Sequence, residues 1–220
     1  MKRQSGPFMT IIFACAAVLA AMAAPASAPL AQEKTIRLVA FGDSLSAGYN
    51  LPQEAAFPVV LEKALKAKGY NVEVANAGVS GDTTSGGLDR LDWSVPDGTD
   101  GVILELGAND MLRGLDPAGI RKNLEAIVER LKSRNIPVLL AGMLASPNLG
   151  HSYTEQFGTI YPDIAKKYDL VLYPFFLDGV AGERSLNLPD GMHPTAKGVE
   201  IIVERILPSV ESFLARLSQR

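Results

Sequence analysis

The sequence predicts an α/β protein of three layers, in which one parallel sheet lies between two layers of helices. Short apolar runs rich in β-branched residues alternate with longer stretches whose apolar residues recur at helical spacing. Two of these runs, 101–107 and 136–142, are almost continuously apolar, as expected of strands covered on both faces. The chain has 220 residues, which suits one domain of this class and is too short for two.

Five apolar runs are predicted as strands, and a polar or glycine-containing segment follows each of them. They are 35–41, which ends at Gly42, 71–77, 101–107, 136–142 and the weaker 169–174. Three stretches are predicted as long helices, namely 54–70, 116–135 and 195–217. The second has the clearest start, because Asp116 can cap it and Pro117 occupies the first helical position.

The first 28 residues have the composition of a secretory signal peptide. Two basic residues precede an apolar run from Phe8 to Ala24, and small residues follow it. We expect cleavage after Ala28, with Ala31 as the alternative, so that residues 29–220 form a single exported domain that is periplasmic or secreted. Because the apolar run has about 17 residues, an uncleaved membrane anchor is the other interpretation.

Composition restricts the partners of the processed chain. Cleavage removes Cys15, the sole cysteine, and leaves no thiol, disulfide or cysteine metal site. The formal charge of −3 becomes −5 when Lys2 and Arg3 are lost, and no basic cluster remains to follow phosphates, which argues against nucleic acid. We expect no stable membrane insertion after processing, and the sequence gives no signal for an oligomeric state. The absence of G-x-S-x-G and of a P-loop motif disfavours an α/β-hydrolase elbow and an NTPase.

The polar segments that follow the predicted strands are expected to meet at one edge of the sheet. Ligands of open α/β sheets bind beyond the carboxyl ends of the strands. The segments are "GDSLSAGYN", "NAGVSGDTT", "GANDMLRG", "MLASPNLGHSY" and a long fifth segment that ends in "DGMHP". This edge is therefore the expected site.

Several residues at this edge have both a structural and a functional interpretation. Ser44 is either the N-cap of a helix or a nucleophile. Asn109 either forms an Asx turn or donates its side-chain amide to a developing oxyanion. Gly81 is either a turn residue or an exposed backbone N–H donor. For Asp43 we expect a structural role, in which its hydrogen bonds fix the loop.

A serine nucleophile needs a base that titrates close to neutral pH, and the chain has two histidines. His193 follows Asp190 by three residues, so a single turn can hold the carboxylate against the imidazole. His151 begins a predicted helix, and we expect it to lie on the surface or to line a groove. The spacing therefore favours His193 as the base.

These segments resemble, in order and spacing, the four blocks of the SGNH (GDSL) hydrolase superfamily. The matching stretches are "GDSLSAGY", "NAGVSGDTT", "GAND" and "DGMHP", and the likeness extends over about residues 36 to 210. The stretches are most similar to the bacterial thioesterase I, lysophospholipase and arylesterase branch. The resemblance implies a flavodoxin-like fold with a five-stranded parallel sheet and hydrolysis of small-molecule acyl esters and thioesters. It also implies that neither a metal nor an organic cofactor is needed.

The resemblance assigns a role to each block. The nucleophile falls on Ser44 and the base on His193, with Asp190 orienting the imidazole. The backbone amides of Ser44 and Gly81 and the side chain of Asn109 are implied as oxyanion donors. An acyl-enzyme on the serine then forms and is hydrolysed by water.

Five apolar residues are predicted on loops at the same edge, where no strand or helix pattern buries them. They are Met111, Leu112, Leu115, Leu144 and Leu149. They either cap the core or form an apolar wall for the acyl chain or aryl leaving group. Two other functions remain open, namely a carbohydrate O-deacetylase of the same superfamily and an inactive binding module on the same fold.

Overall fold

The computed structural model describes Met1 and residues 34–219, and the account below concerns these residues. The chain divides into a short unit, Met1–Gln32, and a main unit, Glu33–Arg220. Apart from Met1, the predicted signal peptide lies outside the described residues. None of the helices in the described part of the chain is long and apolar enough to span a bilayer.

A five-stranded parallel sheet forms within residues 34–219, with the strand order β2-β1-β3-β4-β5. The strands are β1 (Ile36–Gly42), β2 (Val72–Gly78), β3 (Gly101–Glu105), β4 (Val138–Ala141) and β5 (Val171–Tyr173). This is the flavodoxin-like order, in which the direction of winding changes between β1 and β3. The predicted fold class is confirmed, and the carboxyl ends of β1 and β3 are where a ligand is expected.

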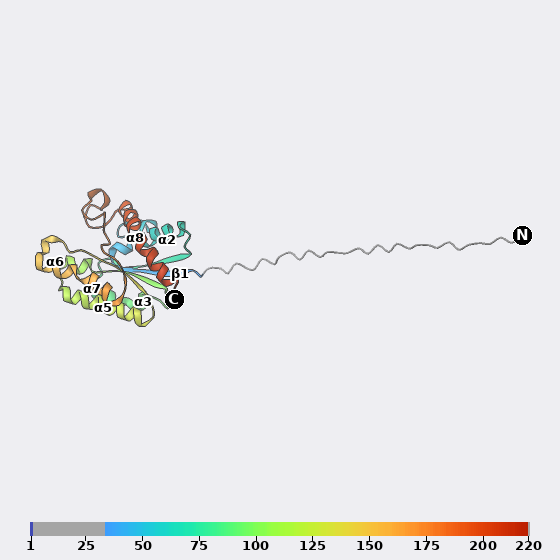
Figure 1. Cartoon of the computed structure of the whole chain (residues 1–220). Helices are drawn as coiled ribbons and strands as arrows, with labels where there is room; N and C mark the ends of the chain where they lie inside the picture. Colours follow the sequence, from blue (N-terminus) through green and yellow to red (C-terminus); the bar gives the residue numbers. More distant parts are fainter. Residues whose placement is uncertain (2–33, 220) are drawn as a thin grey trace. The chain divides into compact units, whose positions relative to one another are not determined.

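Helices cover both faces of the sheet (Figure 1). On one face α2 (Phe57–Ala67) packs against α8 (Ala196–Leu217), and on the other α5 (Pro117–Ser133) contacts both α3 (Thr84–Ser94) and α7 (Ile160–Tyr168). The shorter elements are α1 (Ser44–Ala47), α4 (Ala108–Leu112), α6 (His151–Gly158) and the 3₁₀ turns η1 (Gln53–Ala55), η2 (Pro147–Leu149) and η3 (Arg184–Leu186).

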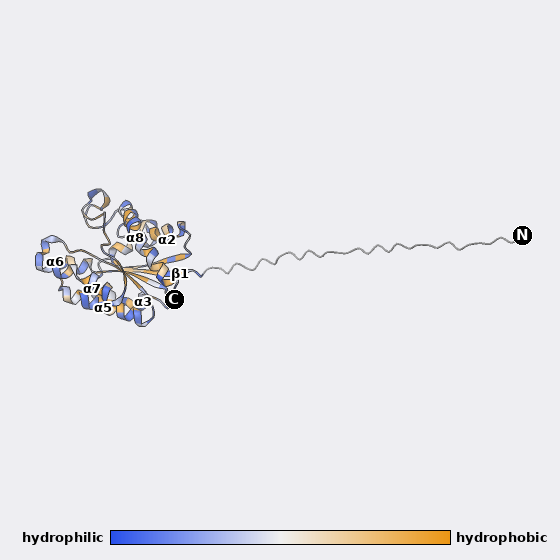
Figure 2. Ribbon diagram, viewed as in Figure 1, coloured by the Kyte–Doolittle hydropathy of each residue, from blue (hydrophilic) through white to orange (hydrophobic). Residues whose placement is uncertain are grey.

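The central strands form the core. Every residue of β3 and β4 is buried, which accounts for their almost continuously apolar runs. Figure 2 shows the apolar sheet between helices whose outer surfaces are polar. Burial on both faces holds the strand ends, and hence the loops that follow them, in fixed positions.

The observed elements differ from the predicted ones at several boundaries. The strand predicted over 101–107 ends at Glu105, because its neighbour Gly42 is the last residue of β1. The helix predicted from residue 54 begins at Phe57, since Ala56 has extended backbone angles. Helix α3 was not among the predicted elements. The predicted cap is confirmed, because the Asp116 side chain accepts a hydrogen bond from Ala118 N–H at the start of α5.

Candidate active site

Ser44 lies in a tight turn between β1 and α1, at the carboxyl edge of the sheet. The interpretation of Ser44 as an N-cap is wrong, because Asp43 caps the helix and accepts a hydrogen bond from Leu45 N–H at 3.0 Å. Ser44 is the first residue of α1 and is 7% exposed. Gly42 is required before it, since a Cβ there would overlap Ser46 and Glu105. The turn thus presents the Ser44 hydroxyl at the edge of an otherwise buried segment.

His193 joins Ser44 to Asp190. Its Nε2 lies 2.9 Å from Ser44 Oγ, and its Nδ1 lies 2.8 Å from Asp190 Oδ2. An ionised carboxylate can only accept hydrogen bonds, so it selects the tautomer with the proton on Nδ1. Nε2 is then left as an acceptor for the Ser44 hydroxyl proton.

Asp190 is held as a carboxylate by the turn that carries it. Its Oδ1 accepts hydrogen bonds from the backbone N–H of His193 at 3.0 Å and of Met192 at 2.9 Å. These two bonds, followed by the bond to the His193 ring, lower the pKa of Asp190 to about 2. The carboxylate form therefore persists over the whole neutral range.

The loop that carries His193 is closed on itself by backbone hydrogen bonds and is held from behind by the Asn187 side chain. Leu188 N–H donates to the carbonyl of His193 at 2.7 Å, and Asn187 pairs with Pro194 as an antiparallel bridge. The Asn187 side chain is buried and donates to the Val180 carbonyl at 2.7 Å. On the nucleophile side, the ring of Tyr49 packs against the imidazole, with 4.4 Å between ring centroids.

Three potential hydrogen-bond donors come from the ends of three neighbouring strands. The backbone amides of Ser44 and Gly81 have no hydrogen-bond partner among the described residues. Gly81 has φ +81°, a conformation that favours glycine, and Arg113 donates to its carbonyl at 2.7 Å. The third donor is Asn109 in α4, whose Nδ2 donates to Asp43 Oδ2 at 2.9 Å. Asn109 is thus held by a side chain of the nucleophile turn.

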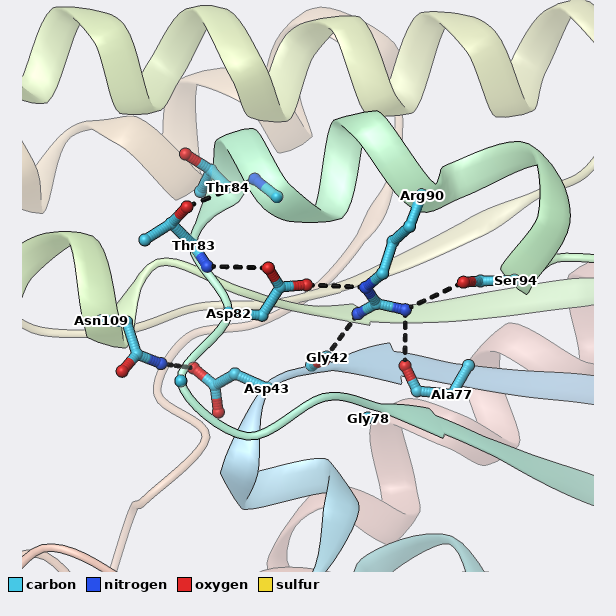
Figure 3. Close-up of polar contacts among 12 residues, drawn as sticks. Gly42, Asp43, Ala77, Gly78, Asp82, Thr83, Thr84, Arg90, Ser94 and Asn109 are labelled. Atoms are coloured by element: carbon cyan, nitrogen blue, oxygen red, sulfur yellow. Dashed lines mark hydrogen bonds and ion pairs between the residues drawn. The ribbon is translucent and has the colours of Figure 1, made fainter.

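A buried ion pair braces the segment after β2. Arg90 Nε donates to Asp82 Oδ2 at 2.6 Å, and these side chains are only 7% and 11% exposed (Figure 3). The same guanidinium donates to the carbonyls of Gly42 and Ala77, at the ends of β1 and β2. One side chain therefore ties the strand before Ser44 to the residue after Gly81.

The predicted apolar residues fall into two groups. Leu112, Leu115 and Leu144 are 55%, 42% and 52% exposed, whereas Met111 is 8% exposed and packs in the core. Leu149 is half-buried against that core. The prediction that all five lie on loops is wrong, because Met111 and Leu112 belong to α4 and Leu149 ends η2.

The structure separates the two histidines. His151 begins α6, as predicted, and its side chain is 92% exposed. Its Nδ1 lies 3.6 Å from the exposed carboxylate of Glu155, one helical turn later. His193 instead lies 2.9 Å from the Ser44 hydroxyl, so the two rings have different surroundings.

Two further features of the site were not identified from the sequence. Tyr49 packs on His193, although the pattern of residues gave no reason to pair them. Glu105 lies fully buried beneath the nucleophile turn and accepts a hydrogen bond from Ser46 Oγ at 2.8 Å. A polar residue at the end of an otherwise apolar strand was the available signal for Glu105.

Comparison with known proteins indicates the family of this chain. Residues 40–201 match the GDSL-like Lipase/Acylhydrolase family. The arylesterase of Vibrio mimicus is 39% identical over 185 residues, which cover 84% of this chain and 92% of that protein. Thioesterase 1/protease 1/lysophospholipase L1 of Escherichia coli K12 is 37% identical over 168 residues, or 76% of this chain and 79% of that protein.

A solved structure of an esterase is also similar to this chain. AlinE4, an SGNH-hydrolase family esterase, is 48% identical, with a TM-score of 0.70 and coverage of 83% of this chain and 98% of that one. The chain therefore belongs to the GDSL-like lipase/acylhydrolase family. It is an SGNH-type esterase.

Proposed function

We propose that this protein is an exported serine hydrolase that cleaves acyl esters and thioesters through an acyl-enzyme on Ser44. The observation that carries the proposal is the continuous set of contacts from Ser44 Oγ through the His193 ring to Asp190, at 2.9 and 2.8 Å. A serine hydroxyl is a weak nucleophile until a base accepts its proton, and this arrangement supplies that base.

The proposed reaction has two half-steps. Ser44 Oγ attacks the acyl carbon while His193 Nε2 accepts the hydroxyl proton, and the same nitrogen then returns that proton to the leaving alcohol, phenol or thiol. A water molecule next gives a proton to His193 Nε2 and attacks the acyl carbon of the ester on Ser44. Collapse releases the carboxylic acid and restores the serine hydroxyl. Asp190 stabilises the imidazolium in both half-steps.

The three donors around Ser44 would receive the negative charge that forms on the carbonyl oxygen. The amides of Ser44 and Gly81 are unpaired among the described residues, and the Asn109 amide has a second N–H besides the one bound to Asp43. Such donors lower the barrier when they are fixed before the charge develops.

Leu112, Leu115 and Leu144 are the proposed wall for the acyl chain or aryl group, because they are exposed and follow β3 and β4 at the reactive edge. Met111 and Leu149 contribute behind this surface, where they pack on the core. An apolar wall favours longer acyl chains through burial of about 25 cal/mol per Å². The thioester part of the proposal is supported by the similarity to the thioesterase of E. coli.

Export is the part of the proposal that rests on the sequence alone. The basic, apolar and small-residue order of residues 1–28 supports it. N-terminal sequencing of protein recovered from the periplasm or medium should begin near Pro29, and an intact Met1 terminus in a cytosolic fraction would contradict it.

The test of the chemistry is one acyl-length series on four proteins. Nitrophenyl acetate, butyrate and octanoate, and a matching thioester, are assayed with the wild type and with Ser44→Ala, Leu144→Gln and Val59→Gln. Ser44→Ala should be inactive, and a serine-directed phosphonate should modify Ser44 in the wild type. Leu144→Gln should weaken octanoate and spare acetate. Val59→Gln, which alters an exposed apolar residue on α2, should change neither.

Each contrary result has a definite meaning. Turnover by Ser44→Ala, or phosphonate on another residue, contradicts the proposed nucleophile. A strong preference for acetate in the wild type favours the O-deacetylase, whereas the inactive binding module is already disfavoured by membership of an esterase family. Equal losses on acetate and octanoate in Leu144→Gln would mean that this side chain only supports packing.

A further inference from the structure

Two carboxyl groups lie buried side by side beneath Ser44, and the proposed reaction uses neither. Asp43 and Glu105 are 0% and 1% exposed. The backbone N–H of Asp43 donates to Glu105 Oε2 at 3.3 Å, and Glu105 Oε1 has no hydrogen-bond partner within the described residues. Burying two acids together costs free energy, so the arrangement needs a reason other than stability.

The hydrogen bonds of Asp43 indicate that reason. Its Oδ1 caps α1 through Leu45 N–H, whereas its Oδ2 accepts from Asn109 Nδ2 at 2.9 Å (Figure 3). The first bond serves the local helix. The second crosses from the end of β1 to the segment after β3 and reaches the side chain that is the proposed oxyanion donor.

We infer that Asp43 is a positioning residue that orients the Asn109 amide, and that its carboxylate is the form that supports turnover. The inference rests on the proposed function, in which Asn109 stabilises the oxyanion. A carboxylate only accepts hydrogen bonds, so Asn109 must present Nδ2 to it and cannot present Oδ1. One N–H then binds Asp43, and the other remains for the substrate oxygen.

Protonation of Asp43 removes its preference for one orientation of the Asn109 amide. A neutral acid can also donate, and because Oδ1 accepts from Leu45 N–H, a proton on Oδ2 favours an amide that has turned by half a rotation. The reversed amide places Oδ1, an acceptor, where the proposed donor stood. It would repel the negative oxygen instead of stabilising it, and the effect would fall on the transition state rather than on substrate binding.

The surroundings of Asp43 favour a change in the protonation of its carboxyl group near pH 6. Burial raises the pKa of Asp43 to about 6, against the opposing bonds from Leu45 and Asn109. Burial and then the neighbouring Asp43 charge raise the pKa of Glu105 well above its usual value, so Glu105 holds its proton more firmly. The other groups that face this pair are His193 from its loop, Asp82, which is paired with Arg90, and Tyr161 from α7. Asp43 is then a carboxylate above about pH 6 and a neutral acid below it.

The first experiment is a double-mutant cycle on kcat with Asp43→Asn, Asn109→Ala and the combination. Asparagine keeps the size of Asp43 and caps helices well, so folding should be retained, as checked by unfolding midpoint. Loss of an oxyanion donor lowers kcat by about 10²–10³-fold. Asp43→Asn should lower kcat at least about tenfold with KM within a few-fold, yet lower it less than about twofold further in the Asn109→Ala background.

A matched control is Asp110→Asn. Asp110 is as buried as Asp43 and adjoins Asn109, but its carboxylate accepts hydrogen bonds from Thr84 N–H and Thr84 Oγ1. Its loss should lower stability, and its effect on kcat should be unchanged by Asn109→Ala.

The second measurement is the acid limb of log kcat against pH, which needs no change at Asp43. Asp43 must lose a proton for full turnover of the wild type, so its titration should add about one to the limiting slope in acid. In Asn109→Ala, and in Asp43→Asn if it folds, this contribution should be absent, and the acid limb should be less steep by about one.

The outcomes separate the two proposals. If the Asp43→Asn and Asn109→Ala losses multiply, and the acid slope of Asn109→Ala equals that of the wild type, Asp43 merely braces the turn and the inference is overturned while the proposed function stands. If Asn109→Ala leaves kcat intact, the proposed oxyanion donor is wrong, and the inference fails with it.

Discussion

The two halves of the site are built in different ways. The half that carries Ser44 lies at the ends of buried strands, and Asp43, Ser44 and Glu105 are each at most 7% exposed. The half that carries the base is a short surface loop, in which the side chains of Asp190 and His193 are 32% and 19% exposed. The nucleophile half is braced by buried side chains, whereas the base half is held largely by backbone hydrogen bonds.

This difference reflects what each half has to do in the proposed reaction. Donors that stabilise a transient charge act best when they are already fixed in a dry environment, which the strand ends provide. A base that exchanges protons with leaving groups and with water needs access to solvent. Rigidity and access are thus divided between two segments that are 149 residues apart in the chain.

The largest expected effect comes from removing the nucleophile of one half or the base of the other. Ser44→Ala and His193→Ala should each lower kcat/KM by about 10⁴-fold or more, and the double variant should be no worse, because the pair acts as a unit. The measurement is nitrophenyl ester hydrolysis at saturating and limiting substrate. His151→Ala is the control and should stay within about twofold of the wild type. A fully active His193→Ala, or one whose residual activity disappears with His151, would show that the base is wrongly assigned.

The second prediction removes the brace of the nucleophile half. Arg90→Met leaves Asp82 as a buried charge without its partner, which should lower the free energy of unfolding by about 3–5 kcal/mol. Arg130→Met is the matched control, because Arg130 and Asp92 form an ion pair in which both side chains are about half exposed, and its loss should cost less than about 1 kcal/mol. Urea denaturation of the two variants measures the contrast. Equal losses would mean that burial does not distinguish these pairs.

The smallest effect on kcat is expected from replacing Tyr49, whose ring joins the nucleophile half to the His193 ring of the base half. Contact of its ring with the imidazolium is worth about 0.5–1 kcal/mol at a partly exposed position, so Tyr49→Leu should lower kcat by about two- to fivefold. Tyr49→Phe keeps the ring and should retain activity. Unfolding midpoints of both variants exclude a general loss of stability. If Leu and Phe at this position prove equally active, the ring makes no contribution to the base.

The fold and the motif residues could be predicted because their signals are local. The apolar runs of β3 and β4 and the cap at Asp116 each depend on a few neighbouring residues. Helix α3 escaped prediction because Gly86 and Gly87 weaken its helical pattern. In the structure Gly87 is packed against Leu106, so the helix is supported by a contact that its own sequence does not show.

The parts of the site that could not be predicted depend on contacts between distant residues. Asp43 and Asn109 are 66 positions apart, and no spacing rule links an acid after one strand to an amide after another. The prediction for the apolar residues of the loops was wrong for a different reason. Met111 and Leu112 are adjacent, but neighbouring positions in a helix point about 100° apart, so one enters the core and the other faces solvent. Only the position of α4 in the folded structure determines which of the two side chains is buried and which is exposed.

The bridge between Asn187 and Pro194 closes the loop that carries Asp190 and His193 into a small hairpin-like unit. A surface unit closed mainly by its own hydrogen bonds can open while the sheet beneath it stays folded. The amides of residues 188–193 would then exchange with deuterium far sooner than those of β3. A preparation can accordingly retain its circular dichroism and still have lost turnover, and recover it once the loop closes again. If the loop opens in this way, the fraction of folded protein and the fraction of competent protein are separate quantities, and hydrogen exchange measured beside turnover would distinguish them.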